Sequence, residues 1–330
     1  MTQTHPRLIA AAGAFLLLLG CGSSAPPAGT ESEGAGSSGP VAASLQQFAG
    51  AWSLARIERR DANGEPLSPP IEDRVGYIMY DSSGHMGVTI MRPDRQPYSE
   101  GGPTPDEALA LIGTYTSYFG PFSVNEDEGY VTHHLVGSLD PRGPGSDYKR
   151  FYTFGENTLT LQPPAREDGS KTFLTWERLP DLPESEQTET HRKLIGVYRI
   201  ESVTRQTTDG ESVPIDQYEK AYIMYAPSGH MSVHLMRPGR SPYAGDRPTA
   251  DEALAATRTY ASYFGPFSVH EYEGFVVHHR IGSENPAGTG TDAKRFYELN
   301  DTHLTLKPPV QSDSQGRQLQ TALRWARITE

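Results

Sequence analysis

TPDEALALIGTYTSYFGPFSV, residues 104–124, recurs as TADEALAATRTYASYFGPFSV at residues 249–269. Sixteen of the 21 positions are identical in the two stretches, which lie 145 residues apart. Self-similarity at a fixed spacing indicates a repeat architecture, so the chain is a tandem duplication. A structural account of one repeat therefore serves for both halves of the 330-residue chain.

The repeated stretch begins with the signals of a helix N-terminus. Thr104 suits the N-cap, Pro105 suits the first helical position, and Glu107 completes a capping box. The Gly-Pro pair at 120–121 predicts that the helix ends at about Phe119. An apolar stripe at helical spacing comprises Ala108, Leu111, Tyr115, Tyr118 and Phe122. We expect this stripe to lie against the sheet of its own repeat.

The rest of each repeat has the pattern of short antiparallel strands joined by turns. In repeat one the expected strands cover residues 48–54, 75–80, 86–91, 122–126, 130–138, 148–154, 157–162 and 171–179. Eight such strands in a small unit favour closure, because closure removes unpaired edges. The sequence therefore predicts a mainly β protein of two tandem antiparallel barrels, each with about eight strands and one α-helix.

Several motifs of repeat one resemble those of a known family. Gly50-Ala51-Trp52 on the first expected strand resembles the Gly-x-Trp signature of lipocalins. The Gly-Tyr-x-x-Tyr, Gly-His-Met, Met-Arg-Pro, Tyr-Phe-Gly, His-His and Arg-Phe-Tyr motifs follow in order. Each whole repeat is thereby similar to the bacterial lipocalin-like domain family, which implies a small barrel with a central cavity. Repeat two departs from the signature, because Tyr198 stands where tryptophan is expected.

The amino-terminal segment has the parts of an export signal. Arg7 precedes the apolar run 8–19, and the only cysteine, Cys21, follows Leu-Leu-Gly. Leu-Leu-Gly-Cys resembles the lipobox of bacterial lipoproteins, which implies removal of a signal peptide (1–20) and lipidation of Cys21. We expect an exported protein anchored by lipid to the bacterial cell envelope. The outer membrane is favoured, because Gly22 and not aspartate follows the cysteine. The alternative is an ordinary signal peptide with a chance cysteine.

Composition divides the remaining chain into four segments. Residues 21–44 comprise Cys21 and a Gly/Ser/Pro-rich stretch, which predicts a disordered tether because it cannot bury enough apolar area to offset its ordering entropy. Residues 45–180 form the first predicted lipocalin-like domain, the polar stretch 181–193 the linker, and residues 194–330 the second domain.

Charge and motif content exclude several classes of function. The net charge of −12 disfavours a nucleic-acid partner, which requires a basic face. Neither a nucleophile elbow nor a phosphate-binding glycine loop occurs. Adjacent histidines on a strand point to opposite faces, so the His-His pairs cannot both ligate one metal ion. We therefore predict no metal and no cofactor. The expected partners are a small hydrophobic or amphipathic molecule and, through the anchor, a membrane; a protein partner is undefined.

Comparison of the two copies assigns faces to the His-His strand. Leu135 of repeat one corresponds to Arg280 of repeat two, so this side is expected to face solvent. Because side chains alternate along a strand, His134 and His279 are expected to point into the barrels. The histidine that precedes each of them is expected to point outward.

The same comparison predicts a guanidinium inside each barrel. Thr153 corresponds to Glu298, so the opposite face is expected to point inward. That face carries Arg150 and Tyr152 in repeat one, and Arg295 and Tyr297 in repeat two. A buried guanidinium needs an anion or several acceptors, and its planar fork suits a carboxylate. The alternative is a structural plug in which an internal carboxylate or carbonyl groups satisfy the arginine.

Further candidates fall into two groups. Arg92, Arg237, Tyr115, Tyr118, Tyr260 and Tyr263 are predicted ligand contacts, with surface arginines and helix-core tyrosines as the alternatives. Trp52, Arg178, Tyr198 and Arg327 are predicted structural residues. The last strand neighbours the first in a closed barrel, so Arg178 is expected to stack on Trp52.

Three hypotheses follow for the function. The first is a membrane-anchored lipoprotein whose barrels bind a small apolar or amphipathic, carboxylated molecule. The second is an isomerase, cyclase or hydrolase with His134 and His279 as acid–base groups and Tyr152 and Tyr297 as donors. The third is an envelope scaffold whose barrels bind no ligand. Binding is favoured over catalysis, because no orienting carboxylate is visible beside the histidines.

Overall fold

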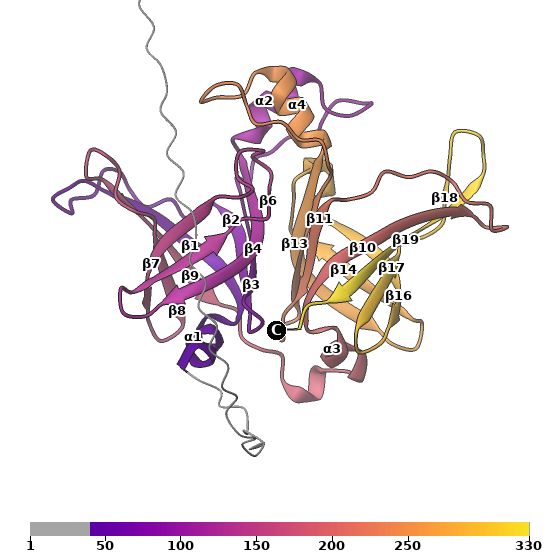
Figure 1. Cartoon of the computed structure of the whole chain (residues 1–330), viewed down its shortest axis with the longest axis horizontal. Coiled ribbons are helices and arrows are strands. Elements are labelled where there is room, and N and C mark those ends of the chain that lie inside the picture. Colours follow the sequence, from indigo (N-terminus) through magenta and orange to yellow (C-terminus); the bar gives the residue numbers. More distant parts are fainter. Residues whose placement is uncertain (1–39, 330) are drawn as a thin grey trace, which may run out of the picture. The chain divides into compact units, whose positions relative to one another are not determined.

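The computed structural model describes residues 40–329, which fall within one compact unit and form two closed β-barrels (Figure 1). The first ring runs β1-β2-β3-β4-β5-β7-β8-β9 and closes where β9 pairs with β1. The second runs β10-β11-β12-β13-β14-β16-β17-β19 and closes where β19 pairs with β10. All these pairings are antiparallel, so the prediction of two tandem eight-stranded barrels is confirmed.

The described elements follow the same order in both repeats, apart from η1, η2 and β18, which occur only in repeat two and its linker. Repeat one comprises α1 (Pro40–Phe48), β1 (Gly50–Arg60), β2 (Val75–Asp81), β3 (His85–Met91), α2 (Pro105–Ile112), β4 (Tyr115–Asn125), β5 (Tyr130–His134), β6 (Gly137–Ser138), β7 (Asp147–Phe154), β8 (Thr158–Gln162) and β9 (Lys171–Arg178). Repeat two, with its linker, comprises η1 (Glu184–Glu186), α3 (Glu189–Leu194), β10 (Gly196–Thr207), β11 (Lys220–Tyr225), β12 (His230–Met236), α4 (Ala250–Arg258), β13 (Tyr260–His270), β14 (Phe275–Arg280), β15 (Gly282–Ser283), η2 (Pro286–Gly288), β16 (Thr291–Leu299), β17 (His303–Lys307), β18 (Gln311–Ser312) and β19 (Gln318–Arg327).

The repeated stretch folds as a short helix followed by a long strand, so the prediction of a helix to about Phe119 is wrong. The capping box is present, with Glu107 accepting from the Thr104 backbone N–H at 2.8 Å. Helix α2 nevertheless ends at Ile112, and β4 begins at Tyr115. The segment TYTSYF consists mainly of β-branched and aromatic residues, which favour a strand buried on both faces.

Gly120 lies within strand β4 and does not end a helix. A Cβ atom at this position would lie 1.9 Å from the carbonyl oxygen of His134. Gly265 occupies the equivalent place, 1.9 Å from the carbonyl oxygen of His279. Glycine is therefore required here because the neighbouring backbone passes too close for any side chain.

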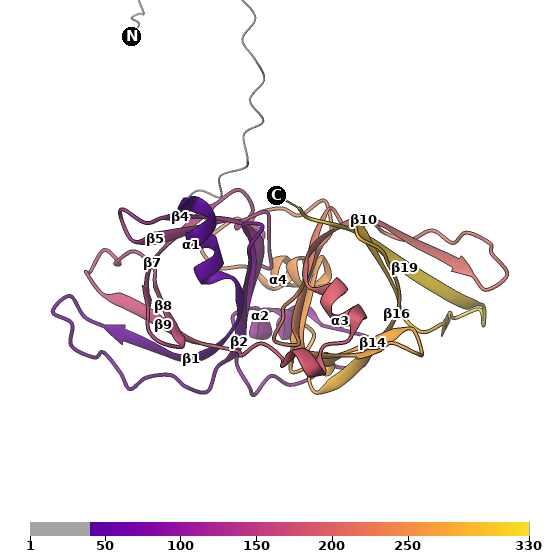
Figure 2. The ribbon, with the colours of Figure 1, turned by 90° about the horizontal axis from the view of Figure 1, so that it is seen from below.

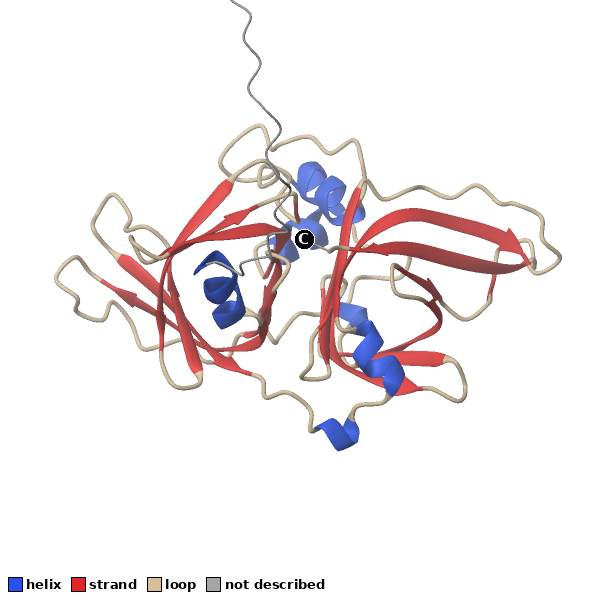
Figure 3. Cartoon of the chain, turned by 60° about the horizontal axis from the view of Figure 1, so that its bottom comes forward, coloured by secondary structure: helices blue, strands red, loops and turns tan. Residues whose placement is uncertain are grey.

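Each repeat contains a second helix that the sequence did not predict. Helix α1 lies across one end of the first barrel, and α3 lies across one end of the second (Figures 2 and 3). Phe48 and Leu194 are fully buried at equivalent places in the two cores. Helix α1 thus begins inside the predicted tether (21–44), and α3 lies at the end of the predicted linker (181–193). Cys21 and the signal peptide lie outside the described residues.

The predicted structural residues hold these two helices in place. Trp52 Nε1 donates to the Phe48 carbonyl at 2.8 Å, and Arg178 donates to the Ala49 carbonyl at 2.9 Å. The Arg178 guanidinium lies 4.4 Å from the Trp52 ring centroid, which confirms the predicted cation–π contact. In repeat two, Arg327 lies 4.6 Å from the Tyr198 ring centroid.

The two barrels meet along the outer faces of β2–β4 and β11–β13, a contact that we call the seam. Helices α2 and α4 lie side by side at one edge of the seam (Figure 1). The prediction that each helix packs on the sheet of its own repeat is therefore wrong. Arg95 donates to the Ser283 and Glu284 carbonyls, and its counterpart Arg240 donates to the Ser138 and Leu139 carbonyls. The contact is therefore self-complementary, as in a two-fold symmetric dimer.

Candidate functional site

Each barrel contains a cavity, of about 360 Å³ in the first and about 560 Å³ in the second. An apolar part of each wall is built twice from equivalent positions. The paired wall residues are Ile57 and Val203, Ile78 and Ile223, Val88 and Val233, Ile90 and Leu235, Leu161 and Leu306, Leu174 and Leu323, and Trp176 and Trp325. Both volumes fall within the usual range for small-molecule sites.

A guanidinium lines each cavity, as predicted. Arg150 lines the first and Arg295 the second, and both are half-buried. Each donates to a carbonyl of its own strand, Lys149 O at 2.9 Å and Lys294 O at 2.8 Å. Within residues 40–329, neither forms an ion pair with a carboxylate. The carboxylate form of the plug alternative is therefore wrong for the described chain, whereas a carbonyl does accept from each arginine, as the other form of that alternative supposed.

The histidines are oriented opposite to the prediction. His133 and His278 are fully buried inside the barrels, whereas His134 and His279 lie on the outer face. His134 Nδ1 lies 2.7 Å from Asp147 Oδ1, and His279 Nδ1 lies 2.8 Å from Asp292 Oδ1. The acid–base role predicted for His134 and His279 inside the cavities is therefore wrong.

The error came from the comparison of Leu135 with Arg280. Both positions face inward: Leu135 belongs to the first core, and the Arg280 guanidinium lies 5.7 Å from the Tyr263 ring centroid. Arg280 also hydrogen-bonds to Thr291 Oγ1. A long cationic side chain can thus occupy an inward position near the end of a barrel while its charge finds polar partners.

Each buried imidazole bridges two tyrosines. His133 Nε2 lies 2.7 Å from Tyr80 Oη, and its Nδ1 lies 3.1 Å from Tyr118 Oη. In the second barrel, His278 Nε2 lies 2.8 Å from Tyr225 Oη, and its Nδ1 lies 2.9 Å from Tyr263 Oη. Burial holds the pKa of both histidines well below the usual value, and the nearby guanidinium lowers it further. Both imidazoles are therefore neutral at physiological pH.

The four tyrosines of the repeated stretch divide between two places. Tyr118 and Tyr263 line the cavities, as predicted. Tyr115 and Tyr260 lie instead in the seam, where Ser117 Oγ is 2.9 Å from Tyr260 Oη and Ser262 Oγ is 3.0 Å from Tyr115 Oη. They point away from the cavities because they alternate with inward residues along a strand and not around a helix.

Tyr152 and Tyr297 face inward but do not line the cavities. The Tyr152 ring packs edge-on against Phe48 at 5.0 Å, and Tyr297 Oη lies 3.3 Å from Thr190 Oγ1. Both therefore contact the helices that cover the barrel ends. The donor role predicted for them requires a contact with the cavity that they do not make.

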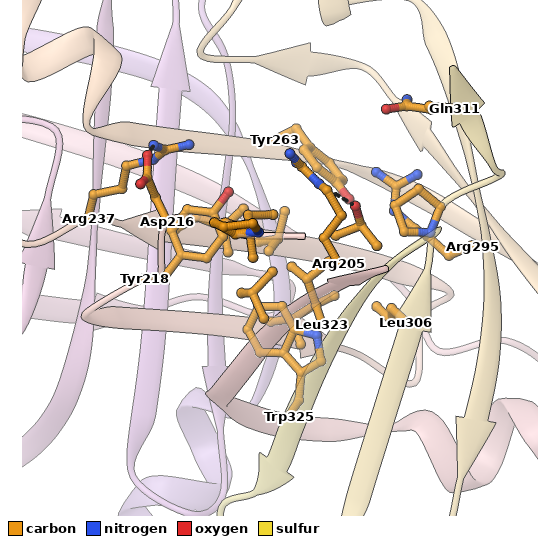
Figure 4. Close-up of a pocket in the computed structure, with 18 residues that line it drawn as sticks. Arg205, Asp216, Tyr218, Arg237, Tyr263, Arg295, Leu306, Gln311, Leu323 and Trp325 are labelled. Atoms are coloured by element: carbon orange, nitrogen blue, oxygen red, sulfur yellow. Dashed lines mark hydrogen bonds and ion pairs between the residues drawn. The ribbon is translucent and has the colours of Figure 1, made fainter. Parts of the chain in front are cut away.

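Charged side chains surround the opening of each cavity. Arg92 lines the first cavity and is exposed, whereas Arg237 lines the second and pairs with Asp216 at 2.6 Å. Figure 4 shows this pair on one side of the second cavity and Arg295 on the other. Sequence reasoning missed Arg74, Arg205, Asp216 and Tyr218, because they belong to long loops or strand ends without periodic pattern.

Two features are absent from the part of the chain between residues 40 and 329. No group of three or more histidine, cysteine, aspartate or glutamate side chains there could hold a metal ion. None of the helices in that part is long and apolar enough to span a bilayer.

Comparison with known proteins agrees with this architecture. A family model described as a lipocalin-like domain matches residues 49–179 and again residues 195–328. No curated protein matches the chain. Among solved structures, a protein of unknown function from Nostoc punctiforme, of the DUF3598 family, is 11% identical with a TM-score of 0.25, over 88% of this chain and 100% of that one. Transferrin-binding protein B from Haemophilus parasuis is 7% identical with a TM-score of 0.19, over 79% of this chain and 54% of that one. Both likenesses are too distant to extend to function.

Proposed function

This chain belongs to the lipocalin-like domain family in two tandem copies, and from that premise we propose that each barrel binds a small amphipathic molecule with a carboxylate head. Lipocalin-like barrels commonly bind small hydrophobic ligands. The observation that carries the proposal is the repetition of one cavity, with the same apolar wall and the same arginine, at equivalent positions of both copies.

The apolar wall supports the hydrophobic part of the ligand. Seven of the paired wall positions are aliphatic or tryptophan in both copies. Burial of an alkyl chain against such a surface contributes roughly 25 cal/mol for each Å² of apolar area removed from water. A ligand with an alkyl chain of medium length would therefore bind mainly through this apolar surface.

Arg150 and Arg295 support the carboxylate. A guanidinium stays charged at any physiological pH, and its fork matches the two oxygens of a carboxylate. Both arginines donate to one carbonyl of their own strand and retain further N–H groups for a ligand. An anionic head would supply the countercharge that the described chain does not place beside them.

We extend the proposal to the location of the protein. The lipobox-like sequence before Cys21 and the polar stretch that follows would tether the barrels to the bacterial envelope by lipid, with the outer membrane favoured. Cells fed an alkyne fatty acid should label the wild-type protein and not Cys21→Ser. Equal labelling of both would contradict the anchor and leave the binding proposal untouched.

Titration calorimetry of the purified barrels with decanoate tests the binding proposal. We expect about two decanoate molecules per chain, one for each barrel. Arg150→Ala with Arg295→Ala should weaken binding at least tenfold, because charge-assisted hydrogen bonds contribute about 1.5–3 kcal/mol. Arg166 is exposed and lines neither cavity, so Arg166→Ala is the matched control. Unchanged decanoate affinity in the double variant would rule out recognition of the carboxylate by these arginines. Absence of decanoate binding by the wild type would rule out the binding proposal itself.

A further inference from the structure

The histidine that bridges two tyrosines decides which hydrogen bonds the cavity can offer. In the first barrel the chain of contacts runs from Tyr80 through His133 to Tyr118. Tyr118 lines the cavity together with Arg150, whereas Tyr80 does not line it. The imidazole therefore connects a phenol that is buried away from the cavity to a phenol that lines it.

A neutral imidazole carries one N–H and one acceptor nitrogen, so only two arrangements are possible. If Nε2 carried the hydrogen, it would donate to Tyr80, and the Tyr80 hydroxyl would need another acceptor. Within residues 40–329, His133 is the only hydrogen-bond partner of the Tyr80 hydroxyl. Such an arrangement would leave a buried donor unsatisfied, which costs about 1–3 kcal/mol.

The other arrangement satisfies every buried group. Tyr80 donates to Nε2 over 2.7 Å, and Nδ1–H donates to Tyr118 Oη over 3.1 Å. Tyr118 Oη then already accepts, and its own O–H has no acceptor among the described side chains and carbonyls. That O–H is free to donate to a molecule in the cavity, next to the N–H groups of Arg150.

From this geometry we infer that Tyr118 and Tyr263 each donate a hydrogen bond to the ligand carboxylate, with His133 and His278 as the positioning residues. The inference rests on the proposed function and specifies its head-group site. Each site then presents a guanidinium and a phenol O–H, both donors, and selects a head group that only accepts. Carboxylates are preferred over alcohols, and amines are rejected.

The second barrel repeats the arrangement with different surroundings. Tyr225, His278 and Tyr263 keep the same order and contacts, at 2.8 and 2.9 Å. Around them Tyr148 of repeat one is replaced by Ala293, and Leu135 by Arg280. The same hydrogen-bonded chain is therefore kept while its packing differs, which is what a shared head-group site requires.

Displacement of the neutral fluorophore N-phenylnaphthylamine by decanoate and by decanol tests the inference. The wild type should prefer decanoate at least tenfold. Tyr118→Phe with Tyr263→Phe should weaken decanoate binding about tenfold and leave decanol within about twofold, because only the carboxylate loses a charge-assisted bond. Tyr80→Phe with Tyr225→Phe should also reduce the preference for decanoate, although neither residue lines a cavity, because the imidazole is then free to accept from Tyr118 or Tyr263. A merely structural role would weaken both ligands equally.

The matched control is Tyr77→Phe with Tyr222→Phe, which removes the same atoms from seam residues on strands β2 and β11. Nitrogen-15 NMR of the imidazoles gives a readout independent of ligand: Nδ1 should carry the hydrogen in His133 and His278. Nε2–H histidines, or decanoate affinity unchanged by Tyr118→Phe with Tyr263→Phe, would overturn the inference and leave the proposed function standing. A wild type that displaces the fluorophore with neither compound would overturn both.

Discussion

Gly120 shows how a single residue sets the shape of the first barrel. Its missing side chain lets the His134 backbone approach to a distance at which a Cβ would be only 1.9 Å from the carbonyl oxygen. Gly120→Ala must therefore push β4 and β5 apart or bend one of them. We expect a loss of about 3 kcal/mol or more in the free energy of unfolding, measured by urea denaturation, because backbone and not a flexible side chain blocks the new atom.

Gly113→Ala is the matched control for Gly120→Ala. Gly113 adopts a right-handed helical conformation at the end of α2, and a Cβ there would meet no atom within 4 Å. The substitution should be neutral or stabilise the protein by up to about 1 kcal/mol, since alanine lowers the entropy of the unfolded chain. Equal destabilisation by the two variants would contradict the close-approach explanation.

Helices α1 and α3 are short, but each places a fully buried side chain, Phe48 or Leu194, in the core of its barrel. Phe48, at the end of α1, is fully buried and packs edge-on against Tyr80 at 5.2 Å, Tyr152 at 5.0 Å and Phe154 at 4.9 Å. Phe48→Ala should lower the free energy of unfolding by about 3–5 kcal/mol, because truncation loses both the apolar burial and the packing around the cavity left behind. Thermal unfolding followed by calorimetry measures the effect.

Gln47→Ala supplies the comparison within the same helix. The Gln47 side chain is exposed, and its backbone carbonyl, which accepts from Arg178 at 3.1 Å, remains in the variant. We expect a change of less than about 0.5 kcal/mol. Should Phe48→Ala be as mild as Gln47→Ala, α1 would not be part of the folded barrel.

At the scale of elements, the sequence predicted what depends on pattern and missed what depends on tertiary context. The duplication, the eight strands and the inward Arg150 followed from alternation and from comparison of the copies. The stripe through Tyr115 and Tyr118 satisfied helical spacing but belongs to a strand buried on both faces, and such a strand has no single polar face to reveal it.

The remaining misses share a physical cause. Helix α1 begins in a stretch whose composition predicts disorder, and it is held by Trp52 of the next strand and by Arg178 of the distant strand β9. The prediction for His134 failed because it treated the Arg280 position as solvent-facing, whereas Arg280 faces inward and hydrogen-bonds to Thr291. Tertiary contacts of this kind override local propensity and cannot be predicted from any single segment of the sequence.

At the scale of the molecule, the seam is nearly symmetric but pairs side chains of different size at two equivalent places. Gly87 of β3 faces His234 of β12, and a Cβ at Gly87 would lie 2.5 Å from His234 Nε2. The equivalent positions in the other repeat are Ser232 and Thr89. His234 Nδ1 lies 3.0 Å from Ser117 Oγ of the opposite barrel. Burial lowers the pKa of His234 to about 3, so the ring is neutral in this contact.

A double-mutant cycle on Gly87 and His234 tests whether this pairing joins the barrels. Gly87→Ala alone should lower the free energy of unfolding by about 1–3 kcal/mol, because the buried imidazole must move and lose its contact with Ser117. His234→Thr alone should also destabilise, since it leaves a cavity over Gly87. Together the two changes should cost less than their sum by at least about 0.5 kcal/mol, because the new methyl group fills part of the space that the imidazole leaves. Gly245→Ala, in a loop where the nearest atom to a new Cβ is 3.9 Å away, is the control and should be neutral. Strict additivity of Gly87→Ala and His234→Thr in urea denaturation would mean that the two residues do not meet, and that the barrels are held together elsewhere.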